Sequence, residues 1–245
     1  MKMEKIQLFA TCIIDTLYPQ VGMAVVRVLE RVGGEVAFPQ RQTCCGQPAF
    51  NAGMRPQAQK MAEHTIKVFE VTTGPVVVPS GSCAAMIRHG YLELFDGDPS
   101  WFQQAKNLAE RTFEFTEFLV DYLGVADVGA CFRSSVAYHS SCHLLRDLGV
   151  SEQPRALLSA VEGLDFIELP YSDDCCGFGG IFSVEFPEVS TAMLERKITN
   201  IEMCGADVIT SCDGGCITHI NGGLNQRGKT PLALHIAEIL EKKQK

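Results

Sequence analysis

The sequence contains the tripeptide Cys-Cys-Gly twice, at residues 44–46 and again at residues 175–177. When the chain is aligned with itself at an offset of 130 to 133 positions, three segments match, namely 6–14 with 136–144, 38–50 with 169–182, and 76–87 with 208–220. A fourth match pairs "FEFTEFLVDYL" with "LALHIAEILEK" near the end of each half. Repeated matches at one period indicate a duplicated unit. The sequence therefore predicts two cysteine-rich domains, residues 1–128 and 129–245.

Each predicted domain alternates short apolar runs with segments of helical periodicity. The apolar runs, typical of buried strands, are residues 5–10, 35–39 and 75–80 in the first half and 135–140, 165–170 and 207–211 in the second. Residues 19–33, 55–74 and 187–205 have the spacing of helices. Strands that alternate with helices favour a parallel sheet with both faces covered. We therefore expect an α/β fold of two duplicated, Rossmann-like parallel-sheet units that face each other.

Four cysteines in each half follow the predicted strands. Parallel strands place their carboxyl ends on one edge of the sheet, where such folds bind ligands, so these thiols are expected to converge there. The first set is Cys12, Cys44, Cys45 and Cys83, and the second set is Cys142, Cys175, Cys176 and Cys216. Gly46 and Gly177 follow the cysteine pairs, and a residue without a Cβ lets a tightly bent loop approach a bound group.

The high cysteine content predicts metal or redox chemistry. The chain has 11 cysteines in 245 residues, and in a reducing compartment such clusters are better explained by metal binding than by disulfides. All-sulfur ligation favours iron–sulfur clusters or zinc, and the long spacing of these cysteines is unlike that of a zinc finger. We expect one or two clusters of the [4Fe–4S] type, with zinc at one site left open. Cys131 and Cys204 lie outside the repeat register and are expected to be packing residues.

Charge and hydropathy exclude several classes of function. The formal net charge is −8 and the pI is about 5.3, which argues against nucleic-acid binding because phosphate backbones recruit basic surfaces. The uncharged run at residues 6–14 ends at Asp15 without a small-residue cleavage site, which favours a buried strand over a signal peptide. No stretch approaches the roughly 18 apolar residues of a membrane-spanning helix. We expect a cytoplasmic protein that is not itself transmembrane.

Six strings that span nearly the whole chain carry a family resemblance. They are "LFATCIID", "QTCCGQPAFNAG", "SGSCAAMI", "YHSSCHLLR", "DCCGFGGIFSV" and "SCDGGC". They resemble the cysteine-rich CCG domains of heterodisulfide reductase, which have relatives in the iron–sulfur subunits of glycolate oxidase and anaerobic glycerol-3-phosphate dehydrogenase. The arrangement of two repeats in a stand-alone chain is similar to the lactate utilization protein A family.

This resemblance implies an iron–sulfur electron-transfer subunit of an oxidoreductase complex that converts L-lactate to pyruvate and is needed for growth on lactate. It also implies two partner subunits, one of them ferredoxin-like, which catalysis requires. Two alternatives stay open. One is a redox subunit that acts on a thiol or quinone, like the cysteine-rich subunits of heterodisulfide reductase and glycerol-3-phosphate dehydrogenase. The other is a zinc-bound structural scaffold of the complex. The sequence identifies no catalytic residue.

The sequence departs from the heterodisulfide reductase pattern, in which each motif ends in Cys-x-x-Cys. In the first half Ser80 stands at the earlier position, so only Cys83 is available there. In the second half an ungapped alignment places Asp213 opposite Ser80, whereas one inserted residue would place Cys212 there. Cys212 is therefore a candidate fifth ligand of the second site.

Two histidines flank Cys142 in the string "YHSSCH". His139 and His143 are candidates for hydrogen bonds to loop carbonyls, which would be a purely structural role. They are also candidates for donating a hydrogen bond to cluster sulfur, which would raise the reduction potential of the cluster, or for relaying protons. The sequence leaves these alternatives open.

Overall fold

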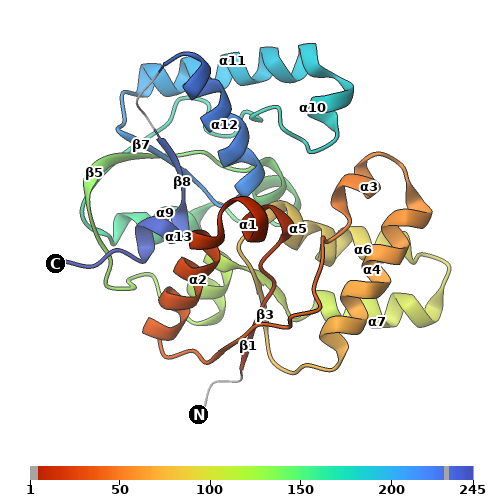
Figure 1. Ribbon diagram of the computed structural model, residues 1–245. Coiled ribbons are helices and arrows are strands. Elements are labelled where there is room, and N and C mark those ends of the chain that lie inside the picture. Colours follow the sequence, from red (N-terminus) through yellow and green to blue (C-terminus); the bar gives the residue numbers. More distant parts are fainter. Residues whose placement is uncertain (1–4, 229–231, 245) are drawn as a thin grey trace.

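The computed structural model describes residues 5–228 and 232–244, and each half of the chain contains a parallel β-sheet (Figure 1). The first sheet has the strand order β2-β1-β3-β4, and the second has the matching order β6-β5-β7-β8. The strands are β1 Ile6–Leu8, β2 Val36–Ala37, β3 Val76–Val78, β4 Thr112–Glu114, β5 Cys131–Tyr138, β6 Glu162–Ile167, β7 Val208–Ser211 and β8 Leu232–His235. The predicted α/β fold of two duplicated Rossmann-like units is confirmed.

Each sheet ends in a fourth strand that was not predicted. β4 pairs with β3 in parallel, and β8 pairs with β7 in the same way. Both strands lie at the segments that match near the end of each half, and both continue directly into a helix. Because no turn residues separate these strands from their helices, neither stands out as a bounded apolar run, which explains why they were not predicted.

Several helices of the first half begin at prolines or at capping side chains. Pro19 and Pro99 stand in the first turn of α2 and α7, where a missing N–H costs no hydrogen bond. Asp98 caps α7 by accepting hydrogen bonds from the amides of Ser100 and Trp101. The elements are α1 Cys12–Leu17, α2 Pro19–Arg31, α3 Gln47–Asn51, α4 Arg55–Glu70, α5 Gly81–Ala85, the π-helical turn η1 Met86–Gly90, α6 Tyr91–Leu94, α7 Pro99–Ala109, α8 Phe115–Glu117 and the π-helical turn η2 Phe118–Tyr122.

The second half repeats this pattern with its own helices. The helix predicted at residues 187–205 is observed as α11 Pro187–Cys204, and it ends at Gly205, whose left-handed φ of 70° stops the helix. The other elements are the π-helical turn η3 His143–Asp147, α9 Glu152–Ser159, α10 Phe182–Glu185, α12 Gly214–Gln226 and α13 Ile236–Leu240. Within the described ranges, no helix combines the length and apolar character needed to cross a bilayer.

The two halves meet through the loops that follow β3 and β7. Oδ2 of Asp213 accepts a hydrogen bond from Ser80 Oγ at 2.9 Å and another from the Ser82 amide at 3.0 Å. The Gly81 amide donates to the carbonyl of Cys212 at 3.3 Å. In addition, α5 packs against η3 and α12 packs against α1, near the centre of Figure 1. The carboxyl edges of the two sheets therefore face each other.

One hydrophobic core continues across this joint. It includes Phe118 from the first half and Leu240 from the second. The helix that follows the fourth strand of each half packs against the other half: α8 packs on α9, and α13 packs on α2. Val128 and Ala130 also belong to this core. The domain boundary between residues 128 and 129 stays a prediction.

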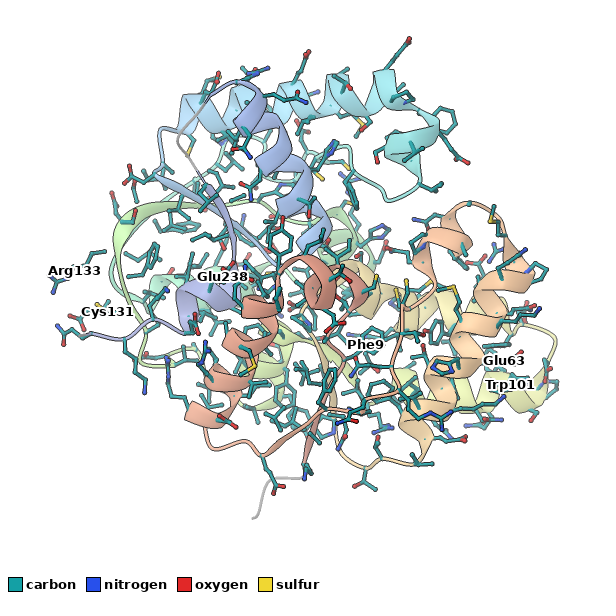
Figure 2. The ribbon with its side chains drawn as sticks, viewed as in Figure 1. Phe9, Glu63, Trp101, Cys131, Arg133 and Glu238 are labelled. Atoms are coloured by element: carbon teal, nitrogen blue, oxygen red, sulfur yellow. The ribbon has the colours of Figure 1, made fainter. Side chains whose placement is uncertain are left out.

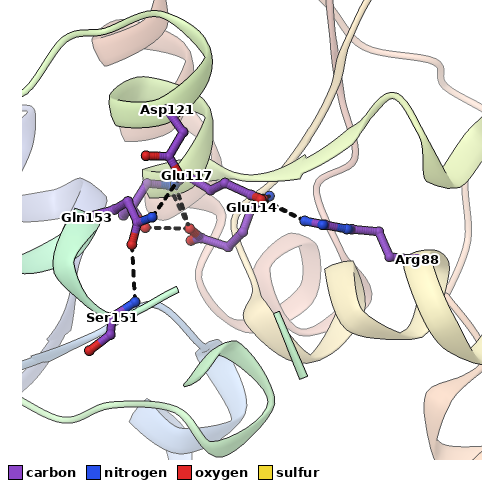
Figure 3. Close-up of polar contacts among 7 residues, drawn as sticks. Arg88, Glu114, Glu117, Asp121, Ser151 and Gln153 are labelled. Carbon is purple, nitrogen blue, oxygen red and sulfur yellow. Dashed lines mark hydrogen bonds and ion pairs between the residues drawn. The ribbon is translucent and has the colours of Figure 1, made fainter. Parts of the chain in front are cut away.

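Polar contacts support the joint around the end of β4 (Figure 3). Arg88 Nη1 lies 2.7 and 2.9 Å from the two carboxylate oxygens of Glu117. Gln153 on α9 donates to Asp121 Oδ2 at 2.7 Å, which links the two halves.

Glu114 is fully buried, and its side chain caps α8 by accepting from backbone amides. Burial raises the pKa of Glu114 to about 8, because a low-dielectric site disfavours the charged form.

Candidate metal centres at the joint between the halves

Three loops at the carboxyl edge of the first sheet gather the first set of cysteines. Cys12 is the first residue of α1, Cys44 and Cys45 precede α3, and Cys83 lies in the first turn of α5. The Sγ atoms of Cys45 and Cys83 are 3.3 Å apart. Cys44 Sγ accepts hydrogen bonds from the thiols of Cys12 and Cys45. The four sulfur atoms thus form one connected group.

The equivalent loops of the second half gather the second set. Cys142 directly precedes η3, Cys175 and Cys176 lie in the loop between β6 and α10, and Cys216 lies in the first turn of α12. Cys175 Sγ accepts hydrogen bonds from the thiols of Cys142 and Cys176, and Cys176 is hydrogen-bonded to Cys216. The connectivity of the sulfur atoms is therefore the same in both halves.

Each set stabilises one thiolate. The pKa of Cys44 is lowered to about 3, chiefly because the Cys12 thiol donates a hydrogen bond to it. The pKa of Cys175 is lowered to about 2 by the equivalent hydrogen bond from Cys142. Thiolates are the form that binds soft metals, and a bound cation favours loss of the remaining thiol protons. The donor set therefore fits a thiolate-ligated metal centre, either an iron–sulfur cluster or zinc.

Glycine is required in both cysteine loops. Gly46 and Gly177 each have a φ of 89°, in the left-handed region that favours glycine. A Cβ at Gly177 would lie 2.6 Å from the Ser190 carbonyl oxygen, and one at Gly46 would lie 3.2 Å from Met61 Cβ. The amide of each glycine donates to the Sγ of the first cysteine in its pair, at 3.5 Å in the first half and 3.4 Å in the second. The bent backbone thus aims an N–H group at each thiolate.

Both sets of cysteines open into a single cavity of about 150 Å³ at the joint. All eight cysteines named above line this cavity, together with loop residues such as Thr11, Phe178 and Asp213. The repeat predicted two separate sites. The tertiary structure adds that the two sets of thiols face one another across a shared space.

Cys212 is not brought to the cavity. Asp213 caps α12 as Ser80 caps α5, and each cap is followed three residues later by a cysteine of the cavity. The structure therefore pairs Ser80 with Asp213, as the ungapped alignment does. Cys212 is fully buried in the shared core, where its Sγ lies 3.7 Å from Tyr138 Oη.

The two histidines lie in different environments. His143 is at the rim of the cavity, and its Nδ1 is 2.6 Å from Asp147 Oδ2. His139 is fully buried, and neither of its ring nitrogens makes a hydrogen bond of regular geometry, although the Ser172 backbone acts on the ring. A ring nitrogen of His139 and the Sγ atoms of Cys176 and Cys216 lie within 4.8 Å of one another.

Charge and burial keep the His139 ring neutral. Its pKa is lowered to about 3, mainly by burial and then by the charge of Lys197. Lys197 is itself fully buried on α11, and its Nζ donates to the Tyr171 carbonyl at 2.7 Å. Lys197 was not predicted as part of the site. The sequence shows only a lysine next to Ile198 in the predicted helix. The structure shows that both residues are buried, on the face of α11 that packs into the second half.

Thr11 is a second residue of the site that was not predicted. It directly precedes Cys12 and has φ 66° and ψ 148°, a combination that is nearly confined to glycine. Such a conformation costs on the order of 1–3 kcal/mol in a residue with a side chain. No local signal in the sequence indicates it, because threonine does not favour positive φ.

The remaining cysteines lie outside the cavity lining. Cys131 begins β5 and lies at the far edge of the molecule in Figure 2. Cys204 ends α11 and packs against the core of the second half. Both side chains are partly exposed.

Comparison with known proteins gives a family match in both halves. The model of the cysteine-rich CCG domain matches residues 6–88 and 136–221. Lactate utilization protein A 2 of Bacillus cereus is 46% identical over 238 residues, which cover 97% of this chain and 98% of that protein. Lactate utilization protein A of Oceanobacillus iheyensis is 47% identical over 236 residues, which cover 96% of each chain.

A solved structure shares the fold. The crystal structure of a hypothetical protein from Helicobacter pylori superposes with a TM-score of 0.66 at 12% sequence identity. The match covers 98% of this chain and 49% of that one, so this chain spans about half the length of the solved protein.

Proposed function

The chain belongs to the lactate utilization protein A family and contains two CCG cysteine-rich domains, and on this basis we propose that it is an iron–sulfur electron-transfer subunit that serves the oxidation of L-lactate to pyruvate. The observation that carries the proposal is that both sets of thiols line the same cavity. Oxidation of lactate to pyruvate releases two electrons and two protons. Two neighbouring one-electron centres suit the stepwise transfer of those electrons.

The chain's own residues prepare the two sites for such a role. An iron–sulfur cluster, when bound, supplies one-electron redox chemistry. The thiolates of Cys44 and Cys175 offer anionic ligands, and the amides of Gly46 and Gly177 donate to them. Hydrogen bonds to ligand sulfur raise the reduction potential of a cluster. Cys45, Cys83, Cys176 and Cys216 are buried, whereas the other four cysteines of the cavity are partly exposed.

Family membership also supports a multisubunit system. We propose that the chain works in the cytoplasm with two other lactate utilization subunits, one of them ferredoxin-like, and that electrons pass between them and the cavity. Affinity purification of the tagged chain from lactate-grown cells of its native host should recover both partners. Recovery of the chain alone under mild anaerobic conditions would contradict this part of the proposal.

A zinc-bound scaffold is the second candidate. The separation of 3.3 Å between Cys45 Sγ and Cys83 Sγ favours it. Four sulfur atoms that each lie about 2.3 Å from one tetrahedral zinc ion are near neighbours of one another. Zinc has no redox chemistry, so this candidate assigns electron transfer to the partner subunits.

The test is the metal and sulfide content of anaerobically purified protein, followed by EPR in the reduced and oxidised states. The proposal expects iron and acid-labile sulfide for one or two clusters per chain and a redox-dependent signal. Cys44→Ser and Cys175→Ser should each lower the metal content of one half only. Cys204→Ser, which changes a cysteine outside the cavity lining, should retain all of it. Zinc without iron, or unchanged metal in both ligand variants, would contradict the proposal.

The physiological role has its own test. A strain that lacks the gene should fail to grow on L-lactate, and the wild-type copy should restore growth while Cys175→Ser should not. Growth on lactate without the gene would instead favour a redox subunit that acts on a thiol or a quinone.

A further inference from the structure

The two candidate centres differ at one matched position of the repeat. The Phe9 amide donates to the carbonyl of Val77 at 3.0 Å, and the His139 amide donates to the carbonyl of Thr210 at 2.8 Å. These hydrogen bonds join equivalent strands, so Phe9 and His139 occupy the same place in the two halves. Both side chains are fully buried (Phe9 is labelled in Figure 2). Because the first half packs a phenyl ring here, the fold itself does not require an imidazole.

His139 lacks the hydrogen bonds that a buried imidazole normally makes. Neither buried ring nitrogen makes a hydrogen bond of regular geometry, and the Ser172 backbone interacts with the ring only weakly. Buried polar atoms are rarely left in this state. At the same time, a ring nitrogen lies within 4.8 Å of Cys176 Sγ and Cys216 Sγ. A neutral imidazole presents a lone pair, and imidazole combined with thiolates is a common ligand set for zinc and iron.

The two halves also differ at a second matched position, which lies on the helices α4 and α11. Gly46 lies against Met61 on α4, and Gly177 lies against Met193 on α11. Met61 and Met193 are therefore equivalent positions, and α4 can be aligned with α11 from them. Four residues further along, the first half has a buried threonine at position 65, and the second half has the buried Lys197. The charge of Lys197 acts on Cys176 and Cys216. The second half also holds carboxylates that the first lacks here, because Asp174 lies near Lys197 and Asp213 stands where the first half has Ser80. The two centres therefore differ in the charged groups around them.

We propose that His139 supplies a nitrogen ligand to the metal held by Cys176 and Cys216, which makes the second centre a mixed imidazole–thiolate site and leaves the first all-thiolate. This inference rests on the proposed function, because it requires metal at the second set of cysteines. A neutral nitrogen ligand adds no negative charge, and histidine ligation raises the potential of an iron–sulfur centre. This difference in ligands makes the second centre the stronger oxidant of the two. Electrons that enter at the first centre then pass to the second.

The experiment isolates each centre by removing the other. The Cys44→Ser variant retains the second centre, and the Cys175→Ser variant retains the first. Each is loaded anaerobically, labelled with ¹⁵N-histidine or left at natural abundance, and examined by pulsed-EPR hyperfine spectroscopy in its paramagnetic state. Where the isolated second centre holds zinc, X-ray absorption at the zinc edge replaces EPR. The matched test variant is His139→Phe in the Cys44→Ser background, because the equivalent position of the first half already holds phenylalanine.

The proposal expects a strong nitrogen coupling, sensitive to ¹⁵N-histidine, in the isolated second centre and none in the isolated first centre. His139→Phe should abolish this coupling while metal remains bound, and it should lower the midpoint potential of the second centre. For zinc, the loss of one nitrogen neighbour in His139→Phe would support the ligand assignment, but zinc at the second centre would refute the order of electron transfer, because zinc has no redox chemistry. A coupling that survives His139→Phe, or one as weak as that of a hydrogen-bonded ring, would overturn the ligand assignment. Absence of metal from the wild-type protein would instead refute the proposed function, so the two failures are distinguishable.

Discussion

Asp213 connects the two halves beside the cavity, and its replacement by alanine should destabilise the joint. The side chain is 5% exposed, and its carboxylate accepts hydrogen bonds from Gly215 N at 3.0 Å, Ser82 N at 3.0 Å and Ser80 Oγ at 2.9 Å. Loss of the cap on α12 costs about 1 kcal/mol. Two donors across the joint lose their partner, at roughly 1–3 kcal/mol each. Asp213→Ala should therefore lower the free energy of unfolding by about 4 kcal/mol.

A double-mutant cycle separates the cross-joint hydrogen bond from the cap. Ser80→Ala removes one donor to Asp213 and also the cap that Ser80 Oγ provides for α5, so it should cost about 2–3 kcal/mol. Because a hydrogen bond to a charged group is worth roughly 1.5–3 kcal/mol, the two substitutions should couple by about that amount. The measurement is urea unfolding of each variant at matched metal content. Asp207→Ala is the control, because Asp207 is exposed and hydrogen-bonds to Ser135 within the second half, so its cost should be well below that of Asp213→Ala.

The result that would refute this reasoning is additivity. A coupling energy below about 0.5 kcal/mol is the value found for independent sites. It would show that residues 80 and 213 do not interact, and that the two halves do not meet through the loops after β3 and β7.

Three further predictions concern single residues. Gly177→Ala would place a Cβ 2.6 Å from the Ser190 carbonyl oxygen at a φ of 89°. It should lower the urea midpoint and empty the second centre; metal content equal to wild type would contradict the requirement for glycine. Thr11→Gly should relieve the strain at φ 66° and raise stability by up to about 1 kcal/mol, because added backbone freedom in the unfolded chain offsets part of the gain; a loss of stability would contradict the strain. Burial raises the pKa of Glu114 to about 8, so the folded state holds a proton that the unfolded state releases above its lower pKa. Its contribution to stability therefore falls as pH rises from about 5 to 8, by at most about 1.4 kcal/mol per pH unit. Glu114→Gln should remove that slope in urea unfolding, and an unchanged slope would contradict the raised pKa.

Much of the fold was readable from the sequence because the signals are local and occur twice. The strand at β3 was indicated by a short apolar run and the helix α4 by helical spacing, and each has a counterpart at a nearly fixed offset. Edge strands β4 and β8 were missed because each continues directly into a helix, so no turn residues mark it as a separate apolar run. The cysteines were read as ligands because thiols that end parallel strands must lie at one edge of the sheet.

Three features follow from the chain alone, namely the duplicated parallel sheets, the edge at which the thiols gather, and the need for glycine after each cysteine pair. These features depend on local propensities and on strand direction. Three others required the tertiary structure: the two edges face each other, Cys212 packs into the core while Asp213 reaches Ser80, and His139 is buried beside Cys176 without a hydrogen bond of regular geometry. Those outcomes depend largely on contacts between segments far apart in the sequence, and no local pattern in the chain encodes the relative placement of two halves that share one core.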